Sequence, residues 1–402
     1  MSRVAKAAVG LMAATLVAKI LGFGRELALA SAYGASGVSD AFLVAMNIPA
    51  VIFTAIGTSL GTAFIPLYCE VNANKGEQSS NKFTNNVFNI VVIICIVISV
   101  IGAIFTPQIV KIFAVGFEGE TLRLAIYFTR VMILGLAFLG MSYIMMAYLQ
   151  VKENFIIPGF MSVPYNIIII ISIIVSVKIS PYLLPWGTLI GLSLQFLFQL
   201  PFAIKKGYRY KLYIDVKDEH LKRMLWLIAP VLIGVAVNQI NTIVDRTIAS
   251  TLVEGSISAL NYATKLNQFV MGMFIVSISS VVYPMLSKLS SENNKEQFNK
   301  SIITSVNTVT LLVIPISIGA IILANPIVKL LFQRGEFDVR ATQMTAVALI
   351  FYSIGMIGYG LRDILGKVFY SLQDTRTPMI NGVIAMVLNI TLNILFVKYP
   401  NM

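Results

Sequence analysis

Residues 84–106 read TNNVFNIVVIICIVISVIGAIFT, a run of 23 residues without a single Asp, Glu, Lys or Arg. About 20 apolar residues in an α-helix are enough to cross the hydrocarbon core of a bilayer. Residues 84–106 therefore predict a transmembrane helix, and comparable runs recur along the whole chain.

The composition of the chain indicates the same class of protein. Of its 402 residues, 57% are hydrophobic and only 12% are charged, which is far from the balance of a water-soluble domain. We therefore predict an all-α polytopic membrane protein. Its expected spans are residues 7–33, 40–69, 84–106, 122–149, 155–178, 182–204, 224–251, 257–287, 302–325, 341–372 and 378–397.

These spans fall into two similar sets, because residues 24–77 reappear in altered form at residues 245–296. Arg25 stands nine residues before Gly34, as Arg246 stands nine residues before Gly255, and a polar loop follows in each set. The loops are residues 72–78 and 291–297, and a later echo of Tyr148 at Tyr370 gives an offset near 222 residues. Such duplication is how many transporters build a central cavity that opens to either side.

We therefore predict two pseudo-symmetric six-helix lobes around a central cavity. Residues 1–215 form the N-terminal lobe with six spans, and residues 216–402 form the C-terminal lobe with only five. We expect the second lobe to be incomplete and the chain to be part of a longer protein.

Basic residues in the loops predict the orientation of the chain. The connection between the sixth and seventh spans contains seven of them, against Asp215, Asp218 and Glu219: Lys205, Lys206, Arg209, Lys211, Lys217, Lys222 and Arg223. This loop, and with it the N-terminus, is expected in the cytoplasm. Since the basic residues are spread over many loops, the net charge of +12 indicates contact with anionic lipids and no nucleic-acid partner.

Several kinds of chemistry find no support in the sequence. The only cysteines, Cys69 and Cys95, and the single histidine, His220, cannot build a disulfide framework or a zinc site. A nucleotide-binding loop with the pattern Gly-x-x-x-x-Gly-Lys-Ser/Thr is also missing from the sequence. We predict no catalytic residues, and any pumping must draw on an ion gradient or on the membrane potential.

Charged residues inside the spans are the candidate functional residues, because a charge in the hydrocarbon normally faces a wet cavity or a partner. Lys19 and Lys265 have no acidic residue three or four positions away, so an anionic substrate would supply the missing partner. Asn261 lies one turn before Lys265 and adds a hydrogen-bond donor on the same face.

Structural explanations compete with this interpretation. Arg25 with Glu26, and Asp245 with Arg246, could form ion pairs to other helices. Asp363 and Lys367 stand four residues apart, which favours mutual neutralisation on one helix face.

Five segments resemble the MurJ (MviN) lipid II flippases of the multidrug/oligosaccharidyl-lipid/polysaccharide exporter superfamily. They are Lys19-Ile-Leu-Gly-Phe-Gly-Arg25-Glu26, Ser39-Asp40-Ala-Phe-Leu-Val-Ala45, Ile48-Pro49, Ala63-Phe-Ile-Pro66 and Phe369-Tyr-Ser-Leu-Gln-Asp-Thr-Arg-Thr-Pro378. The first and the last are the most specific. The resemblance implies fourteen helices in the bacterial cytoplasmic membrane. It also implies a role in peptidoglycan biosynthesis and cell wall biogenesis: translocation of lipid II, the undecaprenyl-pyrophosphate-linked precursor, by alternating access.

The resemblance also places a substrate site on this chain. The family's cavity cations fall on Lys19, Arg25 and Lys265, with Glu26 at the adjoining acidic position. Lysine keeps the charge of arginine but loses the two-pronged guanidinium that fits phosphate, so recognition at Lys19 and Lys265 is expected to be looser.

A sodium site is the one ion site that the resemblance implies. It would map to Asp245, Asn389 and Asn393, of which the two asparagines lie four residues apart on one helix face. No other cofactor is expected, and we expect the protein to be a monomer.

Three classes of function remain open at this point. A lipid-linked oligosaccharide flippase is favoured, for lipid II or for another polyprenyl-linked glycan. A drug/cation antiporter of the same superfamily would prefer a cavity rich in carboxylates, whereas the embedded charge here is mostly positive. A membrane glycosyltransferase would need a catalytic carboxylate on a sizeable outer loop, whereas the longest outer connections here, such as the one with Glu118 and Glu120, are short.

Overall fold

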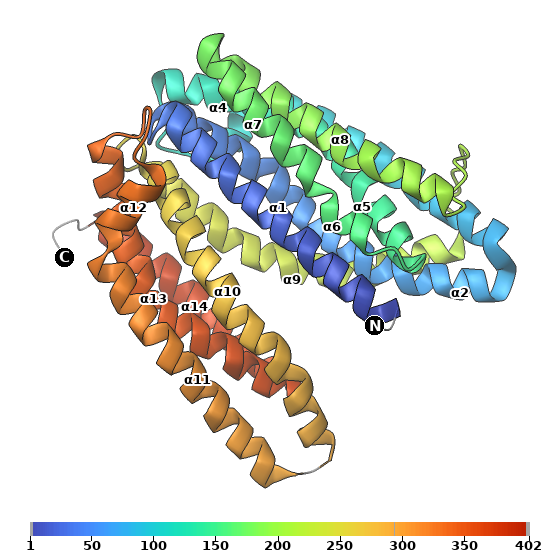
Figure 1. Cartoon of the computed structure of the whole chain (residues 1–402). Coiled ribbons are helices and arrows are strands. Elements are labelled where there is room, and N and C mark those ends of the chain that lie inside the picture. Colours follow the sequence, from blue (N-terminus) through green and yellow to red (C-terminus); the bar gives the residue numbers. More distant parts are fainter. Residues whose placement is uncertain (1–2, 293, 399–402) are drawn as a thin grey trace. The chain divides into compact units, whose positions relative to one another are not determined.

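The computed structural model of this chain describes residues 3–292 and 294–398, and the regular structure of this part is entirely helical (Figure 1). The chain divides into two compact units, Met1–Leu252 and Val253–Met402. Each unit is a bundle of long helices joined by short turns. The predicted all-α polytopic fold is confirmed.

The first unit contains nine α-helices and two short 3₁₀-helices among its described residues. They are α1 (Arg3–Tyr33), α2 (Gly37–Ile104), α3 (Thr106–Phe113), α4 (Gly119–Met132), η1 (Ile133–Gly135), α5 (Leu136–Val151), α6 (Ile156–Phe160), α7 (Ser162–Lys178), η2 (Pro181–Leu183), α8 (Leu184–Lys205) and α9 (Glu219–Ala249). Helix α2 packs against α4, α5 and α9, while α1 lies along α6 and α7.

The second unit contains five described helices. They are α10 (Ser256–Ser291), α11 (Lys295–Ile322), α12 (Ala324–Phe332), α13 (Val339–Ser371) and α14 (Arg376–Lys398). Helix α13 packs against both α10 and α11 around a small apolar core that includes Ile275, Val309 and Met356.

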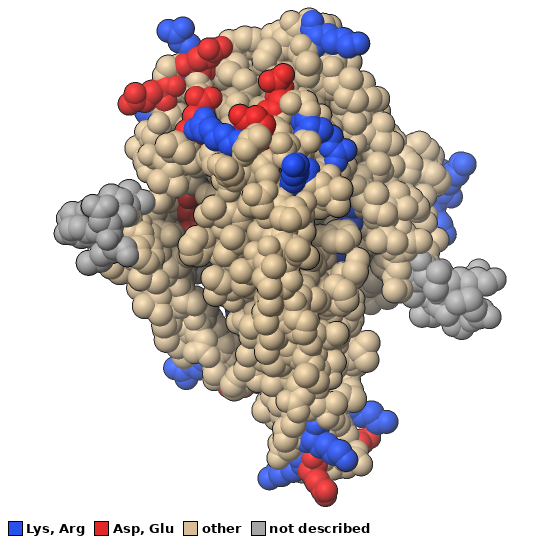
Figure 2. Space-filling model, turned by 60° about the vertical axis from the view of Figure 1, so that its left-hand side comes forward, with Lys and Arg blue, Asp and Glu red and all other residues tan. Residues whose placement is uncertain are grey.

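Eight of the eleven predicted spans coincide with helices long and apolar enough to cross a membrane, among the residues described. The other three fall on α1, on the first half of α2 and on α9, where the chain is also helical. On the face shown in Figure 2, charged side chains gather in groups, and much of the surface between the groups is uncharged. The chain is a multi-pass membrane protein.

The polar segment 72–78 differs from its expected loop conformation, because it is helical except for one residue. Gly76 has φ 75° and ψ 178°, and it alone breaks α2 into its two spans. A glycine adopts this positive φ without steric cost, so one residue is enough to turn the chain. The two spans therefore continue as helices beyond the hydrocarbon. The matching segment 291–297 does contain a break, between the end of α10 and the start of α11.

The internal repeat is visible in the backbone at an offset of 220 residues. Helices α4 and α13 begin at Gly119 and Val339, and the turns that follow carry Glu153 and Gln373 at φ 58° and 60°. In each turn an N–H closes the helix on a carbonyl five residues earlier, from Asn154 to Leu149 and from Asp374 to Phe369. This offset agrees with the predicted value near 222 to within two residues.

Two short helices repeat as well, and the sequence analysis missed both. Helices α3 and α12 bury residues spaced by three or four positions, namely Thr106, Val110 and Phe113 in α3 and Ala324, Val328 and Phe332 in α12. With eight and nine residues, they are too short to register as spans.

Helix α9 corresponds to α1 in the order of the repeat, and both helices have 31 residues. Its contacts nevertheless place it in the first unit, where Leu221, Met224 and Ile228 join the core formed by α2 and α5. The boundary between compact units therefore follows α9, at Leu252. The lobe boundary at residues 215 and 216 rests on the repeat and stays a prediction.

Candidate functional site

Arg25 and Glu26 form a salt bridge within α1. The Arg25 guanidinium donates from Nη2 to Glu26 Oε1 over 2.7 Å. Neighbouring residues on a helix normally point apart, so the long arginine side chain must turn back to make this contact. The structure thus shows an ion pair within one helix. The Glu26 side chain is only 3% exposed and that of Arg25 16% exposed, so the pair is largely withdrawn from water.

Helix α7 holds the same guanidinium from the other side. Arg25 Nη1 donates to Asn166 Oδ1 over 3.3 Å, and Arg25 Cζ lies 6.0 Å from the centre of the Tyr165 ring. Asn166 is itself fixed, because its Nδ2 donates to the Ser162 carbonyl. A guanidinium has five N–H donors, and Glu26 and Asn166 accept from two of its nitrogens. Arg25 therefore has a fixed orientation and spare donors for an anion.

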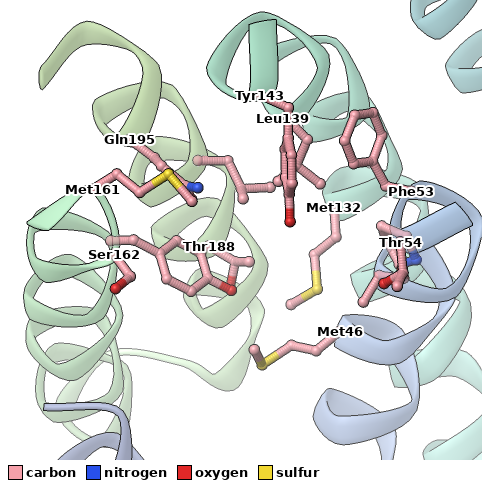
Figure 3. Close-up of a pocket in the computed structure, with 14 residues that line it drawn as sticks. Met46, Phe53, Thr54, Met132, Leu139, Tyr143, Met161, Ser162, Thr188 and Gln195 are labelled. Carbon is pink, nitrogen blue, oxygen red and sulfur yellow. The ribbon is translucent and has the colours of Figure 1, made fainter. Parts of the chain in front are cut away.

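Tyr165 also lines a pocket of about 290 Å³ in the first unit (Figure 3). The pocket lies between α2, α4, α5, α7 and α8. Its lining is Met46, Pro49, Ala50, Phe53, Thr54, Met132, Leu139, Tyr143, Met161, Ser162, Tyr165, Thr188, Leu192 and Gln195. None of these residues carries a charge at neutral pH.

The pocket combines flexible apolar side chains with a few polar groups. Figure 3 shows Met46, Met132 and Met161 around the cavity, together with Tyr143. Methionine adapts to irregular ligands, while the hydroxyl groups and the buried amide of Gln195 offer hydrogen bonds. The arrangement suits an uncharged, partly apolar portion of a ligand, next to a cation at Arg25.

The predicted substrate residues are distributed over both units. Lys19 lies exposed on α1, where its ammonium makes no hydrogen bond or ion pair with the described residues. Lys265 and Asn261 are half-buried, one turn apart on α10, as their spacing predicted. The structure brings Arg25 and Glu26 into direct contact.

The residues predicted for sodium lie on α9 and α14. Asn393 Nδ2 donates to Asn389 Oδ1 over 3.0 Å, so the two amides share one face of α14. Asp245, in the first unit, accepts a hydrogen bond of 3.5 Å from Asn241. In the part of the chain that the structure describes, no three acidic, histidine or cysteine side chains cluster as a metal site.

Asp363 and Lys367 do not neutralise each other, contrary to expectation. Asp363 Oδ2 instead accepts from the Ser279 hydroxyl on α10. Lys367 Nζ lies 5.7 Å from the centre of the Tyr283 ring, an arrangement stabilised by the ring's negative face. Packing between α10 and α13 supplies partners that spacing along one helix could not reveal.

Sequence reasoning missed the contribution of α7 and α8 to the site. Asn166 is a lone amide at the start of an isoleucine-rich run, and Gln195 and Gln199 stand four residues apart in α8. Amides at such positions are costly to expose to hydrocarbon, so these residues could have indicated a polar partner or a site. The methionines and tyrosines of the pocket carried no such signal, because they are common in any apolar helix.

The fold is that of a known class of membrane transporters. An inward-facing multidrug resistance MATE family transporter of the MOP superfamily matches with a TM-score of 0.69, over 97% of this chain and 98% of that one, at 12% identity. The protein thus has a transporter fold.

The sequence identifies the family within this class. The family model "Lipid II flippase MurJ" matches residues 29–401, and the chain belongs to this family. A solved structure, "Lipid II flippase MurJ, inward closed conformation", has a TM-score of 0.84 and 31% identity, over 97% of this chain and 82% of that one.

Curated relatives agree with this assignment. The probable lipid II flippases MurJ of Buchnera aphidicola subsp. Baizongia pistaciae and of Vibrio cholerae are 31% and 30% identical, over 98% of this chain and 78% of each relative. The lipid II flippase MurJ of Burkholderia cenocepacia is 29% identical, over 91% of this chain and 73% of its own length.

Proposed function

We propose that this protein is a lipid II flippase, which moves the undecaprenyl-pyrophosphate-linked peptidoglycan precursor across the cytoplasmic membrane by alternating access. The match of the MurJ family model over residues 29–401 carries this conclusion. The protein acts by transport and performs no covalent chemistry on its substrate.

Arg25 is the residue best placed to bind the pyrophosphate. Its guanidinium is held on one side by Glu26 and Asn166, so its remaining N–H groups can meet a phosphate without reorganisation. Partial burial strengthens this attraction, because the surrounding medium screens charge less than water does. Glu26 then acts as a positioning residue.

Lys19, Lys265 and Asn261 complete the proposed substrate site. Each lysine supplies a point charge, and Asn261 supplies an amide on the same face of α10 as Lys265. The uncharged pocket beside Tyr165 would take a neutral part of the precursor. Embedded cations of this kind favour a polyanionic substrate over the cationic substrates of a drug antiporter.

The protein would lie in the bacterial cytoplasmic membrane as a monomer, with its N-terminus in the cytoplasm. The seven basic residues between residues 205 and 223 support this orientation. Sodium, held by Asp245, Asn389 and Asn393, is the proposed coupling ion. Measuring transport with sodium or potassium at a fixed membrane potential tests this role, and equal rates would contradict it.

Transport by the purified protein is the direct test of function. The purified protein is placed in vesicles that contain fluorescent lipid II, and a membrane-impermeant quencher is added outside. Lipid II from the inner leaflet should become quenched faster in these vesicles than in vesicles without the protein. In a host depleted of its own flippase, the protein should restore growth and prevent lipid II from accumulating. Failure in both settings, with the protein present and folded, would refute the proposal.

A further inference from the structure

A ladder of asparagines fixes the loop between α8 and α9 onto α2. We call residues 206–217 the linker loop. Four asparagine side chains of α2 donate from Nδ2 to backbone carbonyls of this loop: Asn81 to Gly207, Asn85 to Arg209, Asn86 to Asp215, and Asn89 to both Lys211 and Tyr213. Asn85, Asn86 and Asn89 are all buried. The linker loop therefore has a defined conformation although it contains no regular helix.

The ladder also shows the path of the linker loop along α2. The loop is bound at Asn81, reaches Asn89 through residues 211 and 213, and returns to Asn86 at Asp215. Leu212 thus lies between the two loop residues bound to Asn89, the residue just before the apolar run that begins at Ile90. The loop turns at the start of the transmembrane segment.

An aromatic cluster at the other end of α8 gives an independent position for the bilayer. Trp186 Nε1 donates to the Tyr127 hydroxyl over 3.0 Å, and the rings of Tyr127 and Tyr182 lie 4.9 Å apart. Exposed Trp and Tyr side chains gather at membrane interfaces. Lys205 follows Trp186 by 19 residues, or about 29 Å of helix, close to the hydrocarbon thickness of about 30 Å. The linker loop therefore lies at the opposite interface.

The outer surface of the linker loop is both apolar and basic. Tyr210, Leu212, Ile214 and Val216 are exposed by 57%, 78%, 48% and 66%, in alternation along the loop. The cations of this segment are Lys205, Lys206, Arg209, Lys211 and Lys217, all exposed. A soluble surface would not hold four such apolar side chains on a rigid loop without a partner.

The acidic groups near the linker loop are too few to cancel this charge, since Asp215 and Asp218 stand against five cations. Asp215 accepts from the backbone N–H of Lys217 and from the Tyr213 hydroxyl, which hold its pKa below its usual range. Asp218 accepts from the N–H groups of His220 and Leu221 at the start of α9. Glu77 is paired with Lys152. The loop thus presents cations to its surroundings.

We propose that the linker loop is a docking surface for anionic phospholipid headgroups. Its apolar side chains enter the interface around Leu212, and its cations contact lipid phosphates. Because the asparagine ladder already orders the loop, little conformational entropy opposes binding. Polybasic segments at the cytoplasmic leaflet attract anionic lipids in this way.

Depth measurements on the whole protein test the location of the loop. A nitroxide label is attached to Leu212→Cys in a Cys69→Ser/Cys95→Ser background. Its accessibility is measured in nanodiscs of phosphatidylcholine with 30% phosphatidylglycerol. We expect greater accessibility to oxygen than to a water-soluble nickel chelate, with the opposite result for a label at Asn74→Cys. A water-accessible label at residue 212 would overturn the proposal and favour a soluble partner.

Lipid titration tests the role of the charges. Quenching of a fluorophore at residue 212 by brominated phosphatidylglycerol, added to phosphatidylcholine nanodiscs, measures the local affinity. Replacing Lys206, Arg209 and Lys211 by Gln should weaken it about fivefold per cation, or roughly 100-fold together. The matched variant with Lys288, Lys295 and Lys300 replaced by Gln should leave it unchanged. Equal losses in both variants, or no loss in the first, would contradict the proposal.

Discussion

At the scale of single residues, Arg25 combines two properties that rarely occur together. It belongs to a local ion pair with Glu26, which alone would mark it as structural, and it keeps hydrogen-bond donors beyond those that Glu26 and Asn166 occupy. A purely structural arginine would be expected to use its whole fork on protein acceptors. The spare donors are the reason to assign Arg25 to the substrate.

Replacing Arg25 should separate charge from geometry. We expect Arg25→Ala to lower lipid II transport by about 10- to 100-fold, because a charge-assisted hydrogen bond contributes about 1.5–3 kcal/mol. Arg25→Lys should retain part of the activity, since a point charge still attracts phosphate without the fork. Transport in vesicles and complementation at native expression measure both effects. Exposed Arg123→Ala is the control, and normal growth with Arg25→Ala would show that the residue is dispensable.

Glu26 is expected to act through stability and through the position of Arg25. Glu26→Gln removes one partner of a largely buried ion pair and should lower the free energy of unfolding by about 3 kcal/mol. The double variant Arg25→Gln/Glu26→Gln should recover much of this loss, because the Arg25 charge no longer remains without the Glu26 carboxylate. Denaturant unfolding in detergent micelles gives the comparison. A double variant less stable than Glu26→Gln alone would disprove the coupling.

At the scale of elements, the turns after α5 and α13 show how a repeat survives when its sequence diverges. Glu153 and Gln373 differ in charge, yet both adopt a positive φ and precede a capping residue, Asn154 or Asp374. The backbone pattern is kept because it reverses the chain between two spans. Identity at these positions is less important than the ability to close the same hydrogen bonds.

The cap at Asp374 gives the stability of α14 a predictable dependence on pH. The hydroxyl and backbone N–H of Thr377, with the N–H of Arg376, hold the pKa of Asp374 below its usual range. The ionised carboxylate therefore stabilises the fold fully at pH values above the ordinary pKa of an aspartate, and this stabilisation is lost as the pH falls through the lowered pKa of the folded state. Hydrogen exchange at the start of α14, relative to its intrinsic rate, should therefore rise as the pH falls below the ordinary pKa of an aspartate. Asp374→Asn should flatten this rise, and an unchanged profile would contradict the assignment.

The spans were predictable from the sequence, whereas the pieces between them were not. A run such as residues 84–106 has one stable solution in a bilayer, a helix that satisfies its own hydrogen bonds. Helices α3 and α12 escaped notice because eight or nine residues carry too few apolar positions for a membrane span. The hydrogen bonds of the asparagine ladder could not be predicted, because the acceptors are backbone carbonyls and no pattern of side chains reveals them.

At the scale of the whole molecule, the repeat and the compact units divide the chain at different places. The second copy of the repeat is predicted to begin near residue 216, while the contacts of α9 keep the chain in the first unit to Leu252. Arg223 and Glu70 join the start of α9 to α2 through two hydrogen bonds of 2.9 Å. The start of α9 is therefore bound to α2 within the first unit.

The candidate site could be predicted only in part, for a reason that also lies at this scale. Embedded charge singled out Lys19, Arg25 and Lys265, because charge in an apolar span is costly wherever it occurs. Tyr165, Asn166 and Gln195 join the site through packing between α1, α7 and α8, which the sequence does not encode at any fixed spacing. The cost of placing a charge in an apolar span identifies single residues in the sequence. The residues that pack against them can be identified only from the folded structure.

A shared pyrophosphate would couple residues of the two units. We expect Arg25→Lys and Lys265→Gln each to weaken lipid II binding about tenfold, since each removes part of a charged contact to phosphate. Together they should depart from additivity by more than about 0.5 kcal/mol, because both cations act on one anion. Binding to the detergent-solubilised protein, measured over the four variants of the cycle, gives the coupling. Lys300→Gln, exposed on α11, should add to Arg25→Lys without coupling. Strict additivity of Arg25 and Lys265 would mean that the two cations serve separate sites, and alternating access around one pyrophosphate would lose its basis.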